Sequence, residues 1–153
     1  ELPATITGPV LADHLIEISN AMLIEVLPKY VTGDIAAYPQ NPAVEPTYSR
    51  KLSKEDGRID WGKPAEQIER EIRAFAGWPK SYTTTHGIEI ALTKAHILDA
   101  HGKPGATTTI NKKPVIYAGE QALAIDRLKP AGKKEMTGEA FLAGYGKQFL
   151  SEI

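Results

Sequence analysis

The stretch from residue 81 to residue 128 constrains the fold most, because it alternates between apolar and polar side chains and is rich in β-branched residues. Turn signals such as His86-Gly87 interrupt it about every ten residues. They divide it into five predicted strands, at residues 81–85, 88–97, 106–110, 114–118 and 122–128. Short strands at this spacing are typical of a small barrel or sandwich. The predicted fold class is therefore mainly β with helices, an OB-like five-stranded barrel.

A predicted helix at residues 64–75 comes directly before these strands. Its apolar side chains recur at helical spacing, at Ala65, Ile68, Ile72 and Phe75. Pro64 suits the first turn, and Gly77 followed by Pro79 favours an end to the helix. The two tryptophans, Trp61 and Trp78, flank it. We expect this helix to plug one end of the barrel, with Trp61 and Phe75 in the core. A last helix is predicted to begin at Thr137, with Met136 and Phe141 as a hydrophobic staple.

The first part of the chain has a different character. Residues 9–31 form a predicted helix with one apolar stripe, at Leu11, Leu15, Ile18, Met22, Val26 and Tyr30. Such a stripe needs a partner surface, so we interpret this segment as the tail of a larger domain. The chain also begins without methionine, and we expect it to be part of a longer protein. Residues 36–58 are proline-rich and predict an extended linker.

The charge is divided unevenly along the chain. Residues 1–45 hold one lysine against six carboxylates, a net charge of −5, whereas residues 46–153 hold 17 basic against 13 acidic side chains, a net charge of +4. Only the second part therefore favours an anionic partner. The absence of cysteine excludes a disulfide framework and fits a reducing compartment. No apolar run approaches the length of a membrane span.

No catalytic pattern is present in the sequence. It contains no G-x-S-x-G motif, no P-loop and no G-x-G-x-x-G fingerprint. The four histidines, His14, His86, His96 and His101, lack the spacing of metal ligands. We therefore expect neither a catalytic residue nor a metal site in this chain.

Basic side chains gather in the linker and in the predicted turns of the barrel. These candidates for binding a phosphate backbone are Arg50, Lys51, Lys54, Arg58, Lys80, Lys112, Lys113, Lys129, Lys133 and Lys134. The alternative, that lysines simply occupy solvated turns, stays open at this point.

Three segments resemble the methionyl-tRNA formyltransferase family. The linker and first helix of its C-terminal domain resemble TYSRKLSKEDGRIDWGKPAEQIEREIRAFAGWP, and the end of that domain is similar to LKPAGKKEMTGEAFLAG. The last helices of its formyl-transfer domain resemble TITGPVLADHLIEISNAMLIEVLPKYVTG. One departure is Gly77, where the family often has Asn-Pro before the tryptophan.

The resemblance implies a cytoplasmic, monomeric enzyme of translation initiation that moves a formyl group from 10-formyltetrahydrofolate to methionine on initiator tRNA. It implies that residues 1–38 end a Rossmann-like catalytic domain, that 39–57 are a linker, and that 58–153 form the OB-like domain. The family's catalytic residues and folate pocket match no position here, so we expect this chain to bind tRNA but no folate. The alternatives are a related formyltransferase acting on a nucleotide sugar or folate, or a non-enzymatic OB-like binding module.

Overall fold

The computed structural model describes residues 2–150, and these group into two compact units. The larger unit comprises Glu1–Gly8 and Leu52–Ile153, and the smaller comprises Pro9–Lys51. The division by contacts does not test the domain boundaries expected from the sequence, which remain a prediction. Within residues 2–150, no helix combines the length and the apolar character that crossing a membrane would require.

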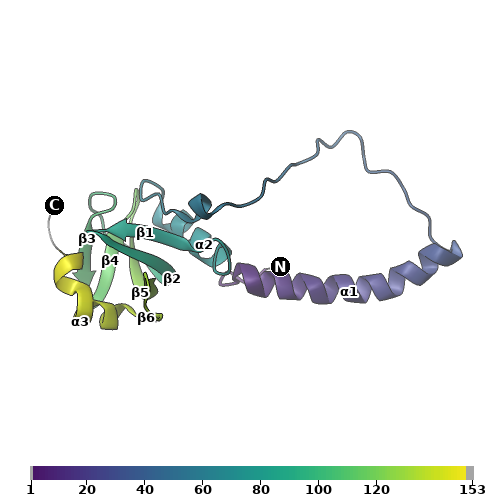
Figure 1. Cartoon of the computed structure of the whole chain (residues 1–153). Coiled ribbons are helices and arrows are strands. Elements are labelled where there is room, and N and C mark those ends of the chain that lie inside the picture. Colours follow the sequence, from purple (N-terminus) through teal and green to yellow (C-terminus); the bar gives the residue numbers. More distant parts are fainter. Residues whose placement is uncertain (1, 151–153) are drawn as a thin grey trace. The chain divides into compact units, whose positions relative to one another are not determined.

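The long helix α1 spans Gly8–Thr32 and continues without a break past Ser19-Asn20 (Figure 1). Its stripe is uncovered: Leu15, Ile18 and Met22 are each more than half exposed. The predicted helix at residues 9–31 is thus confirmed, while the partner surface for its stripe stays a prediction. Residues 33–53 contain no helix or strand, as expected for a linker, and a 3₁₀ turn, η1, follows at Lys54–Gly57.

An antiparallel sheet forms the centre of the larger unit (Figure 1). Its strands are β1 (Ser81–Thr85), β2 (Ile88–Leu98), β3 (Thr107–Ile110), β4 (Lys113–Tyr117), β5 (Ala122–Pro130) and β6 (Met136–Thr137). The order across the sheet is β1-β2-β5-β4-β3, and β6 pairs with β5. All five predicted strands are confirmed. The sixth, only two residues long, is too short to produce a periodic signal.

Two hairpin turns follow the geometry that two-residue loops favour. His86 and Gly87 have φ angles of 46° and 76°, and Asn111 and Lys112 have φ angles of 50° and 61°. Positive φ at both central residues matches the right-handed twist of the flanking strands. The turn predicted over Asn111-Lys112-Lys113 is therefore one residue shorter, and Lys113 begins β4.

Two helices complete the core. Helix α2 (Ala65–Ala74) buries Ala65, Ile68 and Ile72 against the sheet, and helix α3 (Gly138–Phe149) buries Phe141 and Phe149 in the same cluster. The Thr137 hydroxyl accepts a hydrogen bond from the backbone N–H of Ala140 at 3.2 Å, which confirms the predicted cap.

The aromatic residues around α2 depart in part from expectation. Trp61 packs against the core, and its indole N–H donates to Thr83 Oγ1 at 3.0 Å. Phe75, predicted to be core, is only partly buried and belongs to neither cluster of buried side chains in residues 2–150. The helix ends one residue earlier than predicted, at Ala74, and Phe75 is its C-cap. Trp78 is 61% exposed.

The C-terminal end of α3 lies where the two edge strands approach each other. The Thr107 hydroxyl on β3 donates to the Phe149 carbonyl at 2.6 Å, and the Gln148 side chain donates to the His86 carbonyl at 2.8 Å. Among the described residues, no hydrogen-bonded ladder joins β1 to β3. Closure of the sheet into an OB-like barrel stays a prediction.

Candidate nucleic-acid interface

The segment that follows the linker is fixed to the free edge of β1. The Ile59 N–H donates to the Tyr82 carbonyl at 2.9 Å, and Arg58 pairs with Tyr82 in a parallel bridge. Gly57 is buried there, and a Cβ at that position would lie only 2.0 Å from the Lys80 carbonyl oxygen. The close approach needs glycine, and it brings Arg58 into line with the sheet.

The register of the strands then places four residues in one row across the sheet. Arg58 bridges to Tyr82, Tyr82 pairs with Ala91, and Ala91 pairs with Lys129. The neighbours of each row member along its own segment are buried, namely Gly57, Ile59, Ser81, Thr83, Ile90, Leu92, Leu128 and Pro130. Because side chains alternate between faces along a strand, the row lies on the outer face. We call it the outer row.

The outer row places cations around an aromatic ring. Three strand spacings separate Arg58 from Lys129, a span of about 14 Å. The Lys54 ammonium lies over the Tyr82 ring, 5.8 Å from its centroid. Glu89 shares this face, because it is two residues from Ala91 on the same strand. Three of the ten predicted basic residues, Lys54, Arg58 and Lys129, thus lie on the same face of the sheet.

The hairpin after β5 adds two further predicted lysines, Lys133 and Lys134, both exposed. Glu135 fastens this hairpin to the sheet: it accepts from the Thr93 hydroxyl at 2.5 Å and from Arg127 at 2.7 Å. Hydrogen bonds from Arg127 and Thr93 hold the pKa of Glu135 below its usual value. The carboxylate balances Arg127, which leaves Lys129, Lys133 and Lys134 as the exposed cations of the hairpin.

Lys113 differs from the other predicted lysines because it is paired within the sheet. Its ammonium pairs with Asp126, which also contacts His96 Nδ1 at 2.9 Å. The hydrogen bond to Asp126 raises the pKa of Lys113. Burial raises the pKa of Asp126, but the hydrogen bonds from Lys113 and His96 outweigh burial and lower it overall. Asp126 balances the charge of Lys113, and the role of Lys113 in binding stays a prediction.

The remaining predicted residues are not members of the outer row. Lys112 is exposed in the β3–β4 turn, and Lys80 is exposed before β1, with a φ angle of 74°. Arg50 and Lys51 end the smaller unit and are exposed. The structure therefore brings Lys54, Arg58 and Lys129 together, with Lys133 and Lys134 on the adjoining hairpin.

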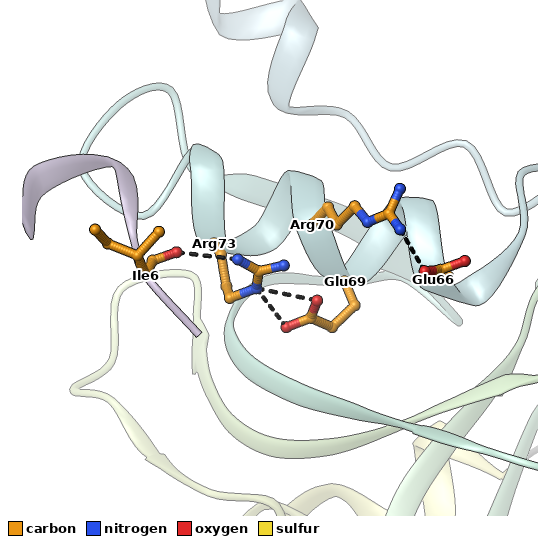
Figure 2. A network of polar contacts seen from close by, with 5 residues as sticks. All are labelled: Ile6, Glu66, Glu69, Arg70 and Arg73. Carbon is orange, nitrogen blue, oxygen red and sulfur yellow. Dashed lines mark hydrogen bonds and ion pairs between the residues drawn. The ribbon is translucent and has the colours of Figure 1, made fainter. Parts of the chain in front are cut away.

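The arginines of α2 are occupied by other contacts (Figure 2). Arg70 pairs with Glu66, and Arg73 donates to Glu69 at 2.8 Å and to the Ile6 carbonyl at 3.0 Å. Both pairs have the i,i+4 spacing that stabilises a helix surface. This charged face of α2 is balanced, so we leave it out of the interface.

An open groove of about 740 Å³ lies between the segment around Thr5 and Thr7, helix α2 and strand β2. Its charged side chains include Glu69, which pairs with Arg73, and Asp126, which pairs with His96. Lys94 also lines the groove. The expectation that this chain binds no folate stays a prediction. In the part of the chain that the structure describes, no three His, Asp or Glu side chains gather as metal ligands do.

Tyr82 and Glu135 are the two members of this region that the sequence analysis missed. Alternation along β1 could have identified Tyr82, because its neighbours Ser81 and Thr83 are buried on the inner face and Tyr82 therefore lies on the outer face. No local signal marks Glu135, because its partner Thr93 is 42 residues away.

Comparisons with known proteins support the resemblance found in the sequence. Residues 51–146 match the family described as formyl transferase, C-terminal domain. Similar curated relatives include methionyl-tRNA formyltransferases of Chloroflexus aurantiacus, 38% identical over 148 residues, and Streptococcus sanguinis, 37% identical over 138 residues. These alignments cover 94% and 90% of this chain but 47% and 44% of those proteins. The chain thus spans about half the length of the curated relatives it matches.

Solved structures share the fold at lower sequence identity. A variant of HypX from Aquifex aeolicus has a TM-score of 0.68 at 20% identity, covering 95% of this chain and 27% of that one. HypX in complex with tetrahydrofolic acid has a TM-score of 0.59 at 22% identity, covering 86% and 23%. From the matched residues and the shared fold, this chain belongs to the formyl transferase C-terminal domain family.

Proposed function

We propose that this chain supplies the tRNA-binding C-terminal part of a methionyl-tRNA formyltransferase. The outer row carries this proposal together with Lys54, because Arg58 and Lys129 lie about 14 Å apart on one face of the sheet and the Lys54 ammonium lies over Tyr82 between them. The identity of the relatives, 33–38%, favours this enzyme over formyltransferases that act on nucleotide sugars or folate. The uncovered apolar stripe of α1, at Leu15, Ile18 and Met22, favours attachment to a further domain over a free-standing binding module.

The chemistry of the interface is that of phosphate recognition. Exposed lysines and arginines neutralise phosphates and release condensed counterions, and they read the backbone rather than the base sequence. The outer row and the hairpin lysines together supply five such cations: Lys54, Arg58, Lys129, Lys133 and Lys134. We propose that they hold the body of the tRNA while its methionyl end is formylated elsewhere in the enzyme.

We propose that in the whole enzyme residues 1–38 complete the catalytic domain, that residues 39–57 link the two domains, and that residues 58–153 form an OB-like barrel. We propose that the formyl donor, 10-formyltetrahydrofolate, binds outside this chain, because the family's folate-pocket motifs match no position here. The enzyme would act as a cytoplasmic monomer in translation initiation.

The test is a salt titration of tRNA binding, followed by fluorescence anisotropy between about 50 and 200 mM salt. Affinity should fall steeply with salt, and initiator and elongator tRNA should be affected alike. Lys129→Ala and Lys133→Ala should each reduce the magnitude of the log–log slope by roughly 0.7–0.9. Glu89→Gln, which removes the acidic member of the outer face, should tighten binding.

Two controls remove a cation away from the proposed interface. Lys29 lies in α1, where it pairs with Glu25, and Arg70 lies on α2, where it pairs with Glu66. Alanine at either position should leave the slope unchanged. A slope near zero for the wild type, or equal losses in the controls, would contradict the proposed interface.

A further inference from the structure

We infer that Tyr82 is a stacking platform for one unpaired base of the bound RNA, with the surrounding cations holding the phosphates on either side of that nucleotide. The inference rests on the proposed function and deepens it, because it adds a base contact to an interface otherwise made to phosphates. It also names the ligand class as a single-stranded segment, since bases inside a duplex are already stacked on both faces.

The orientation of Tyr82 follows from its neighbours on β1. Ser81 is 2% exposed and Thr83 is 6% exposed, and Thr83 accepts the indole hydrogen bond of Trp61 on the inner side. Tyr82 must therefore point outward. Its cross-strand partner on β2 is Ala91, whose methyl group is too small to cover an aromatic ring.

The surroundings of the ring suit a nucleotide. The Lys54 ammonium already lies over the ring, 5.8 Å from its centroid, which shows that the ring face is open to a cationic group. Arg58 and Lys129 stand on the two sides of Tyr82 in the outer row. A base that stacks on the ring would displace Lys54 toward its own phosphate. Grooves of this kind, with aromatic rings among cations, bind single strands with little sequence preference.

Tyr82 is partly exposed, and two more exposed aromatic side chains lack its arrangement. Tyr38, 89% exposed, lies in the smaller unit in a stretch without helix or strand. Trp78, 61% exposed, precedes Pro79 and is not part of the outer row. Tyr38 therefore serves as a matched control for the loss of an exposed tyrosine.

The experiment uses the full chain and an eight-nucleotide oligouridylate that carries one 2-aminopurine base. Binding is measured by anisotropy at low salt, and stacking by the quenching of 2-aminopurine fluorescence. Tyr82→Leu should weaken binding roughly 5- to 150-fold and abolish the quenching, because stacking on one aromatic side chain contributes that much. Tyr82→Phe keeps the ring and should stay within about twofold of wild type. Tyr38→Leu should change neither readout.

The possible outcomes separate this inference from the proposed function. If the oligonucleotide binds with a steep salt slope and Tyr82→Leu has no effect, stacking is refuted and the phosphate interface stands. If the wild type binds neither the oligonucleotide nor tRNA, both proposals fail. If Tyr82→Phe loses as much as Tyr82→Leu, the hydroxyl group and not the ring is responsible, which also overturns stacking. Loss with Leu, retention with Phe and quenching only when the ring is present would support it.

Discussion

Substituting Phe141 by alanine should destabilise the larger unit strongly. The side chain is fully buried, stacks on Tyr145 with ring centroids 5.1 Å apart, and meets Phe149 edge-on at 5.5 Å. Burying such a side chain contributes about 1.5–3 kcal/mol, and each aromatic pair adds about 0.5–1.5 kcal/mol. Loss of these terms matches the roughly 3–5 kcal/mol usual for Phe→Ala in a core. Domains of this size are stable by about 5–15 kcal/mol, so the change is severe.

Phe75→Ala is the matched comparison, since it makes the same chemical change at a partly buried site. The helical spacing alone predicts a loss as large as that of any core phenylalanine. The structure instead places Phe75 outside both buried clusters of residues 2–150, and we expect a loss of only about 1–2 kcal/mol.

Urea unfolding followed by tryptophan fluorescence measures both changes. The signal comes mainly from Trp61, which packs against the core, because Trp78 is largely exposed in the folded state. Both variants should keep the wild-type m-value. The urea concentration at the unfolding midpoint should be much lower for Phe141→Ala than for Phe75→Ala. Equal losses for the two variants would refute the assignment of Phe141 to the core and Phe75 to its margin.

Two further changes test contacts within the larger unit. Gly57→Ala should free the 54–58 segment from β1, because its new methyl group would collide with the Lys80 carbonyl. Hydrogen exchange of the Ile59 amide should then accelerate, and unchanged protection would contradict the close approach. Asp126→Asn should cost about 1–2 kcal/mol at pH 7. Since the folded pKa of Asp126 lies below its unfolded value, this loss should vanish as the pH falls through the folded pKa, whereas a pH-independent loss would exclude the ion pair as its cause.

The sequence predicts most of the fold because its elements carry local signals. The five strands follow from alternation, α2 from its stripe at Ala65, Ile68 and Ile72, and the start of α3 from Thr137. The family resemblance carried by residues 47–79 and 128–144 is confirmed by the family match. The prediction that Phe75 is a core residue was wrong, because periodicity does not show at which residue a helix ends or how deeply its C-cap residue is buried.

The candidate interface was less accessible to prediction, because it depends on register. Composition identifies the lysines but does not distinguish Lys113, whose partner Asp126 lies on the neighbouring strand, from Lys129, which faces outward. The outer row exists because Arg58, Tyr82 and Lys129 come into line across three pairings. Strand pairing joins residues that are far apart in the sequence, from 58 to 129 in this row, so local sequence patterns do not reveal it.

The most direct test of the proposed interface is an amide ¹H–¹⁵N NMR titration of the chain with initiator tRNA. Shift changes and line broadening should gather at Lys54, Arg58, Tyr82, Ala91 and Lys129, and at the hairpin lysines. Helix α2, with its balanced Glu66–Arg70 and Glu69–Arg73 pairs, should be unaffected. Changes concentrated on α2 and the adjoining groove, with the outer row unchanged, would contradict the account.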